Sequence, residues 1–271
     1  MHQRADDPDF GLFGPNSVAW RLHQHPCMLI GGLRALVIQA LNPLAMAAVA
    51  QHSDFRTDPW GRLRRTSEYV TTTIFGDTAT AQAAGARVRA LHRRVRGVDE
   101  VTGRTYSADD PELLLWIHAV EVDSFLAAYR RYGDGLSDAD ADLYAKEMVR
   151  SAELVGLHEE GVPHTEREVH EHLAGVKNLC VTPAAREGLR LVLNPPARLP
   201  GRLAWAVPAT AAVALLPPEV RTLYGLPWFE PADPVVTLSI TALCRTLKLL
   251  VPPPAPVRHA LDAAARRPPP G

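Results

Sequence analysis

Apolar residues recur along most of the chain at spacings of three and four, which is the period of helices that pack on a core. Strand-like alternation is rare. Four segments begin with a side chain suited to capping a helix: Asp110 before Pro111, Ser137 with Asp140 three residues on, Thr165 with Glu168, and Thr182 before Pro183. Gly156 marks the expected end of the helix that Ser137 starts. The pattern therefore predicts an all-α fold, a single irregular multi-helix domain.

The 271 residues divide into three parts. We predict a flexible N-terminus over residues 1–10, a helical domain over residues 11–260, and a disordered, proline-rich tail over residues 261–271. Prolines accumulate after residue 194, but the sequence between them stays apolar. This region is therefore expected to form short helices that pack on the core and are joined by rigid turns.

Two apolar stretches raise the question of a membrane. Residues 31–52 are interrupted by Arg34 and by Asn42-Pro43, and residues 203–218 contain Pro208. Neither offers the roughly 20 uninterrupted apolar residues that a spanning helix needs. We expect both to be buried helices, with no transmembrane segment, and we leave peripheral contact with a membrane open.

Composition narrows the function classes further. Hydrophobic residues make up 46% of the chain, which is enough for a core, and the 29 basic and 30 acidic residues leave a formal charge of −1. This balance argues against nucleic acid as a partner, because proteins that bind it normally carry a net basic domain or stripe. Cys27, Cys180 and Cys244 are far apart and form no CxxC pair, which predicts buried thiols in a reducing, cytoplasmic compartment.

Several common active-site motifs are absent from the sequence. It contains neither GxGxxG nor GxxxxGK[ST], so a dinucleotide fingerprint and a P-loop are missing, and no GxSxG serine elbow occurs. Neither HExxH nor Glu-x-x-His is present, which removes the usual helical zinc and di-iron sites. What remains for an all-α protein is a cofactor held by histidine, or no cofactor.

Two of the eleven histidines stand out. His92 shares a helical face with Val88 and Val95, and His118 lies on a stripe with apolar neighbours. Each is either a core histidine satisfied by a hydrogen bond or a metal ligand. Six others lie in polar or terminal sequence and are expected at the surface: His2, His158, His164, His170, His172 and His259.

A cationic helix face precedes these histidines. Arg62 and Thr66 are four residues apart in "GRLRRTSEYVTTTIFGD", so they share a face, with Arg65 beside them. These arginines either extend to water, as we expect for Arg64, or meet an anionic cofactor inside the protein. Haem fits physically, because arginine pairs with its propionates and histidine ligates its iron.

Ordered blocks over about residues 11–175 resemble a known family. They include "QALNPLAMAAVAQHSDF", "DPWGRLRRTSEYVTTTIFGD", "VRALHRRVRGVD" and "GRTYSADDPELLLWIHAVEVDSFLAAYRRYG". The sequence is similar to the bacterial branch of the MpaB/rubber-oxygenase family, which includes latex clearing protein and a fungal oxygenase that trims a prenyl chain. After residue 200 the resemblance is faint.

The resemblance implies a globin-like helical core around haem b and the use of dioxygen on isoprenoid double bonds. The family's signature is an arginine, a threonine four residues later and a proximal histidine, and it matches Arg62, Thr66 and His92. His118 belongs to the bacterial Trp-x-His motif with Trp116. Either histidine is a candidate iron ligand, and we favour His92.

The chain departs from the family's pattern at two positions. Rubber oxygenases can carry a lysine beside the threonine that occupies the sixth iron position, and here Arg65 stands there. A guanidinium is a poor metal ligand because it stays protonated. Many relatives have a histidine before the proline of the run "QALNP", where this chain has Asn42.

The sequence thus suggests a haem-b-dependent oxygenase that acts on an apolar small molecule or isoprenoid-like lipid. Arg62 and Thr66 are the predicted catalytic residues, Arg62, Arg65 and Thr66 would bind the cofactor, and His92 or His118 would hold its iron. Residues 33–50 and 113–126 would line the pocket. The alternative is a non-catalytic helical protein that binds a hydrophobic ligand or haem, and a helical transcription regulator is a third, weakly supported reading.

Overall fold

The computed structural model of the protein describes residues 9–253, 257–258 and 261–262. Within them the chain forms twelve α-helices, two 3₁₀ turns and one small hairpin, which confirms the all-α prediction. The elements are, in order, α1 (Val18–His23), α2 (Met28–Gln39), α3 (Pro43–His52), α4 (Pro59–Phe75), α5 (Thr78–His92), β1 (Arg96–Val98), β2 (Thr105–Ser107), α6 (Pro111–Tyr132), α7 (Asp138–Val155), η1 (Glu159–Gly161), α8 (Glu166–Gly175), α9 (Pro183–Leu193), α10 (Leu199–Ala214), α11 (Pro218–Tyr224), η2 (Glu230–Ala232) and α12 (Asp233–Leu250).

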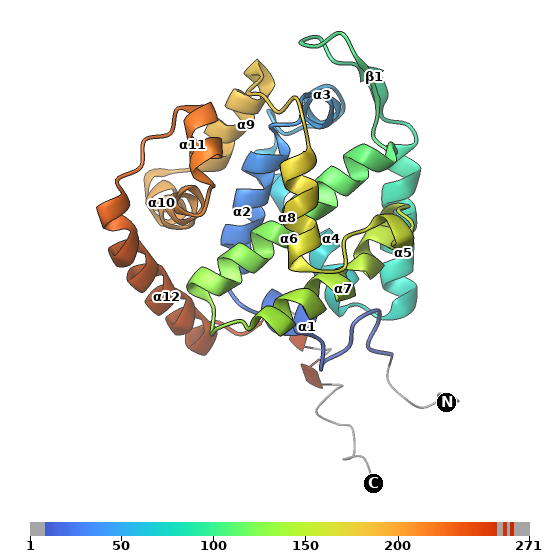
Figure 1. Cartoon of the computed structure of the whole chain (residues 1–271). Helices are drawn as coiled ribbons and strands as arrows, with labels where there is room; N and C mark the ends of the chain where they lie inside the picture. Colours follow the sequence, from blue (N-terminus) through green and yellow to red (C-terminus); the bar gives the residue numbers. More distant parts are fainter. Residues whose placement is uncertain (1–8, 254–256, 259–260, 263–271) are drawn as a thin grey trace.

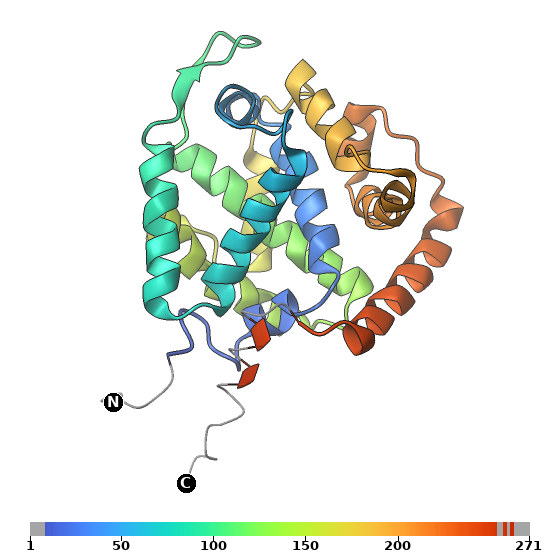
Figure 2. The ribbon, with the colours of Figure 1, turned by 180° about the vertical axis from the view of Figure 1, so that it is seen from behind.

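Helix α6 is the centre of the fold (Figure 1). It packs against α2, α7, α8 and α12, and its apolar residues join both of the largest core clusters. Seen from behind, α4 lies in front of α6, and α5 stands beside it at the edge of the molecule, where it packs on α7 (Figure 2). The C-terminal helices α10 and α12 lie at one edge of the molecule.

The four predicted caps are all present. Asp110, Ser137, Thr165 and Thr182 each accept a backbone N–H in the first turn of α6, α7, α8 and α9 respectively. Gly156 ends α7 with φ +108°, a conformation that glycine adopts without a Cβ clash.

Asn42-Pro43 breaks the first apolar stretch as predicted. The Asn42 side chain accepts from the N–H groups of Leu44 and Ala45 at 3.1 and 3.2 Å and so caps α3, which is bent by 104° relative to α2. This cap is a physical role for an asparagine at the position where many relatives carry histidine. Among the described residues no single helix is both long and apolar enough to cross a membrane, and α2 with α3 and α10 with α11 meet that condition only as bent pairs.

The structure corrects three details of the prediction. Helix α5 ends at His92, so Val95 lies beyond it, in the turn before a hairpin that the sequence pattern did not predict. The second apolar stretch is buried only in its C-terminal half, because Leu203 is 66% exposed. Of the three cysteines, which are free thiols, Cys180 is half-buried.

Most of the two predicted disordered ends, residues 1–10 and 261–271, lies outside the described residues. Asp9 and Phe10 are described. Asp9 accepts from the Thr78 N–H at 2.9 Å, and the Phe10 ring meets the edge of Trp20, so packing on the domain begins here.

Candidate functional site

The inward face of α4 carries the first predicted site residues. Asp58 caps the helix by accepting from the Gly61 N–H at 2.8 Å, and Pro59 takes the first position. Arg62, Thr66, Tyr69 and Thr73 then follow at helical spacing on one face. Thr73 is buried, Arg62 and Tyr69 are half-buried, but Thr66 is exposed. A space that solvent can reach therefore adjoins the middle of this face.

The guanidinium of Arg62 lies in this face without a direct ion pair among the described residues. Among the described residues it has no hydrogen-bond acceptor and no ion pair. Burial lowers the pKa of Arg62, an effect that the nearby charge of Asp54 opposes. The backbone of Arg62 has a local hydrogen bond with a side chain, because Thr66 Oγ1 donates to the Arg62 carbonyl at 3.0 Å. Arg62 is thus a partly desolvated cation that no anion of the described residues contacts directly, although Asp54 lies near enough to affect its pKa.

The two neighbouring arginines have different surroundings. Arg65 is exposed and donates to both carboxylate oxygens of Asp54 at 2.6 and 2.7 Å and to Asp58 at 3.3 Å. Arg64 is exposed and pairs with Glu68 at 3.3 Å, as expected for a side chain that extends to water. The contacts of Arg65 tie the start of α4 to the preceding loop, and its contact with a cofactor stays a prediction.

His92 is the last residue of α5, which packs beside α4. Arg62 lies 13 residues before Phe75, the end of α4, and His92 lies 14 residues after Thr78, the start of α5. Because only two residues link these antiparallel helices, Arg62 and His92 stand at similar heights along the pair, at the ends where the helices diverge (Figure 2). The Nδ1 atom of His92 is buried and has no partner among the described residues. Burial also lowers the pKa of His92, against the charge of Asp109, so the imidazole is neutral at pH 7.

His118 lies on α6 and is buried. Burial lowers the pKa of His118 to about 4, and the proximity of His172 adds to this effect. His172, on α8, was expected at the surface but is half-buried, with a buried Nε2 atom that lacks a partner within the described residues. Two neutral imidazoles therefore lie close together where α6 packs on α8, and the sequence did not predict that they are neighbours.

Open space adjoins the middle of α2. A Cβ built on Gly32 meets no heavy atom within 4 Å, whereas one on the adjacent Gly31 meets the Phe125 ring at 2.9 Å. Leu29, Leu36 and Gln39 share the face of Gly32, and none of them is fully buried. The inner helix of the fold thus has one incompletely covered face.

Glu121 connects this face of α2 with α4. Burial raises the pKa of Glu121 to about 7, although a hydrogen bond with Gln39 of α2 lowers it. Burial and then the charge of Glu121 raise the pKa of Tyr69 on α4 to about 12, and the Tyr69 hydroxyl is buried without a partner in the described part of the chain. We call the region around Arg62, Thr66, Tyr69, Glu121 and Gly32 the interior site.

Sequence reasoning missed Glu121 and Tyr69. A signal existed for both: Glu121 is a carboxylate inside the apolar run of α6, three residues after His118, and Tyr69 is seven residues after Arg62, on the same helical face. His23 was also missed. Its Nε2 atom forms a hydrogen bond with the Tyr144 hydroxyl at 2.9 Å. Burial lowers the pKa of His23 to about 3.

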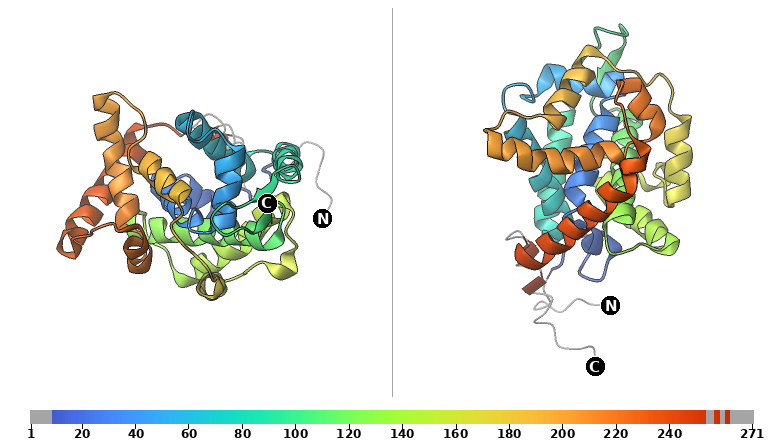
Figure 3. Two further views of the ribbon diagram at one scale, coloured as in Figure 1. Left: turned by 90° about the horizontal axis from the view of Figure 1, so that it is seen from above. Right: turned by 90° about the vertical axis from the view of Figure 1, so that its left-hand side faces the viewer.

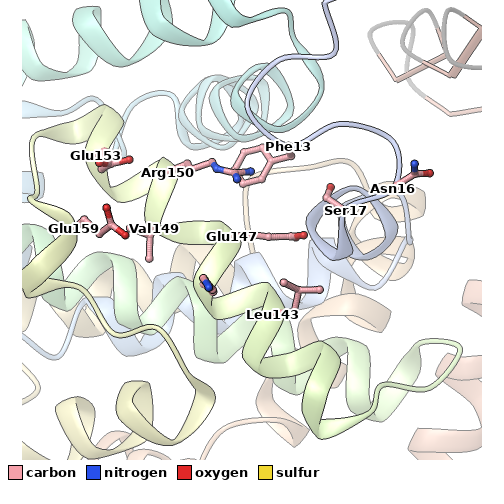
Figure 4. A pocket seen from close by; sticks show the side chains of 10 residues that line it. Phe13, Asn16, Ser17, Leu143, Glu147, Val149, Arg150, Glu153 and Glu159 are labelled. Atoms are coloured by element: carbon pink, nitrogen blue, oxygen red, sulfur yellow. The ribbon is translucent and has the colours of Figure 1, made fainter. Parts of the chain in front are cut away.

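A separate pocket of about 480 Å³ lies between the N-terminal segment and α7 (Figure 4). Its lining includes Phe13, Ser17, Glu147 and Arg150 but none of the residues of the interior site. Glu147 there accepts from the Val18 and Ala19 N–H groups at 3.3 and 2.8 Å, and Arg150 donates to the Leu12 carbonyl at 2.7 Å. These side chains fasten the N-terminal segment to α7.

No group of three or more histidine, cysteine or carboxylate side chains in the described residues is placed to hold a metal ion. A metal held by a single protein side chain, as in haem, does not require such a group.

Comparison with known proteins gives one match. The family model for the catalytic domain of "ER-bound oxygenase mpaB/B'/Rubber oxygenase" matches residues 20–249. The match extends well past residue 200, where the resemblance of the sequence blocks is faint. No curated protein and no solved structure matches the chain significantly.

Proposed function

The chain belongs to the mpaB/rubber-oxygenase family, and from this premise we propose that it is a haem-b-dependent oxygenase that acts on an apolar, isoprenoid-like small molecule or lipid. One observation carries the haem assignment. The Arg62 guanidinium is partly desolvated, lacks an acceptor among the described residues, and lies on a helix face next to a space that solvent reaches. A carboxylate of a bound group would supply the missing charge.

The residues of the interior site fit haem in three respects. Arg62 would pair with a propionate, an imidazole with a depressed pKa would be free to ligate iron, and the uncovered face around Gly32 would receive an apolar surface. When bound, haem would supply the redox chemistry that an oxygenase reaction requires.

We favour His92 as the iron ligand. It ends the helix that packs beside α4, and its buried Nδ1 atom has no partner among the described residues. His118 is the alternative. Burial favours a neutral imidazole there as well, but the neighbouring group that adds to this effect is His172 on α8 rather than a residue of α4.

The chain's own side chains would set the environment of the reaction. The Thr66 hydroxyl would serve as a hydrogen-bonding group beside the substrate. Glu121 would hold a proton near neutral pH, which makes it a candidate donor in a site with few other polar groups. The apolar residues of α2 and α6 would exclude water, so that each of these hydrogen bonds counts for more than it would in bulk solvent.

A visible spectrum with iron quantitation tests the proposal. Protein expressed with haem supplied is expected to show a Soret band and about one iron per chain, His92→Ala is expected to abolish both, and the exposed His158→Ala to change neither. A normal spectrum for His92→Ala together with loss in His118→Ala would move the ligand to α6. Wild-type protein that stays colourless and iron-free would favour the non-catalytic hydrophobic-ligand protein instead.

Arg62 and Arg64 provide a matched pair for the propionate contact. They lie two residues apart on α4, but one faces the interior site and the other pairs with Glu68 at the surface. A hydrogen bond to a charged partner is worth about 1.5–3 kcal/mol, so Arg62→Ala should weaken haem binding roughly 10- to 100-fold, and Arg64→Ala less than about threefold. Equal haem affinity in both variants, measured by titration, would remove Arg62 from the site.

A further inference from the structure

Helices α10 and α12 expose large apolar side chains to an unusual extent. Leu199 and Leu203 on α10 and Leu238 and Leu249 on α12 are 68, 66, 73 and 85% exposed. Single exposed leucines are ordinary on a protein surface, but a contiguous set is rare in a protein that has nothing to cover it.

Exposed apolar residues of α12 follow one outward face, on which Arg245 and Thr246 interrupt them before Leu249. Val235, Leu238, Ala242 and Leu249 follow at helical spacing, and all four are exposed. The opposite side of α12 packs on the main core through Ile240 and Cys244. Helix α12 is therefore apolar on its solvent side as well as on its core side, which core packing does not explain.

Helices α10 and α12 present these residues on one face of the molecule. Arg131 of α6 holds the end of α10 to the start of α12, because it donates to the Ala214 carbonyl at 2.9 Å and pairs with Asp233 at 3.0 Å. From this junction the two helices diverge across a single side of the protein (Figure 3, right). We call this side the α10–α12 face.

The charged side chains of α10 and α12 are mostly basic, and one of them, Lys248, pairs with Asp134. Arg198, Arg202 and Arg245 are exposed, and none of them pairs with a carboxylate of the described residues. Helix α10 contains no acidic residue, and the only one in α12 is Asp233, which Arg131 neutralises. Leucines flanked by unpaired arginines are the composition of helices that lie in the interface of an anionic membrane.

We propose that the α10–α12 face docks the protein on an anionic lipid surface, with its leucines inserted among the acyl chains and its arginines at the headgroups. A second copy of the chain would cover the leucines too, but it would bring the same unpaired arginines against one another. An anionic bilayer satisfies both features at once. This inference rests on the exposed residues of α10 and α12 and does not depend on haem.

Docking in this orientation would place the start of α4 near the lipid. The rings of Trp60 and Trp205 pack edge to face with their centroids 4.8 Å apart. Trp60 Nε1 also donates to the Pro196 carbonyl at 2.8 Å. Trp60 lies two residues before Arg62. The helix that faces the interior site is thus in direct contact with the helix that would lie on the membrane.

Vesicle co-sedimentation tests the proposal on the full chain. Wild-type protein is expected to bind vesicles of phosphatidylcholine mixed with phosphatidylglycerol. Its affinity for pure phosphatidylcholine should be roughly 100-fold lower, because each of the three arginines raises the affinity for an anionic surface about fivefold. Leu238→Glu with Leu249→Glu should lower the partition coefficient at least about 100-fold, because inserting one leucine is worth about tenfold or more. Arg202→Gln with Arg245→Gln should lower it roughly 25-fold on anionic vesicles only.

A matched double variant controls for added negative charge. Leu91 on α5 and Leu143 on α7 are also exposed, at 59 and 46%, but lie away from the α10–α12 face. Leu91→Glu with Leu143→Glu should reduce binding by less than about threefold. Circular dichroism should be unchanged in every variant, because all of these side chains are exposed.

Three results would overturn the proposal. Wild-type protein that fails to bind anionic vesicles, or binding that the Leu238→Glu/Leu249→Glu variant retains, would show that the face is not a lipid-docking surface. A wild-type dimer in light scattering that the same variant converts to monomers would assign the face to a second copy. Vesicle binding is measured from the total amount of protein that sediments, so it does not depend on whether haem is bound. Failure of the lipid-docking proposal and failure of the haem proposal can therefore be told apart.

Discussion

Replacing Glu121 with glutamine tests whether a protonated carboxyl lies between α2, α4 and α6. Burial raises the pKa of Glu121 from 4.5 to about 7, partly offset by Gln39. At about 1.4 kcal/mol for each pH unit, a difference of this size corresponds to about 3 kcal/mol of folding free energy. Glutamine has nearly the same shape and carries no charge, so Glu121→Gln removes the cost of ionising the side chain and leaves the packing.

The sign follows from proton binding. In the folded chain Glu121 keeps its proton up to about pH 7, whereas in the unfolded chain it loses the proton near pH 4.5. The stability associated with this proton is therefore complete below pH 4.5, falls as the pH rises, and is lost above about pH 7. Relative to wild type, Glu121→Gln should gain about 3 kcal/mol between pH 4.5 and pH 8.

Urea denaturation of haem-free wild type and Glu121→Gln at intervals from pH 4.5 to pH 8 measures this difference. Other titrating groups are common to both proteins and cancel in the comparison. Glu153→Gln, a change at an exposed carboxylate of α7, serves as the control and should give a flat difference. If the Glu121→Gln difference is equally flat, the carboxyl is solvated and the description of the interior site is wrong.

Two further predictions concern the framework around the site. Asp123→Ala should lower the free energy of unfolding, measured with urea, by about 3–5 kcal/mol, because the buried Arg34 loses the carboxylate that lies 2.6 Å away. Glu68→Ala removes the partner of the exposed Arg64 and should lower it by less than about 0.5 kcal/mol. Gly32→Ala should stabilise haem-free protein by about 0.5–1 kcal/mol, because the new Cβ enters open space. Gly31→Ala should destabilise it, because the new Cβ meets the Phe125 ring. If both variants shift the melting temperature in the same direction, α2 has no open face.

The elements of the fold that local chemistry determines could be predicted from the sequence. Ser137, Thr165 and Thr182 cap helices because each side-chain oxygen satisfies an N–H three residues on, and this needs no information from elsewhere in the chain. The break at Asn42-Pro43 is local for the same reason. The pairing of Arg62 with Thr66 on one face follows from helical geometry alone.

What could not be predicted depends on contacts between distant residues. The strands β1 and β2 are three residues each and form only because a tight connection pairs them and α3 packs beside them, with Tyr106 donating to Gln51 at 2.6 Å. His172 lies in polar sequence on α8, yet α6 covers it. The exposure of α10 was missed because an apolar helix gives the same pattern whether a core or a membrane covers it.

The three arginines of α4 show why the sequence alone leaves the site open. Asp54 and Asp58 lie just before α4 and Glu68 lies in its middle, so the local sequence has one carboxylate for each of the three arginines. The structure assigns all three carboxylates to Arg65 and Arg64. Arg62 is half-buried where Arg64 and Arg65 are exposed, and Asp54 only moderates its desolvation. Because a partly buried guanidinium without an anion is costly, an acidic group from outside the chain is the simplest completion of this face.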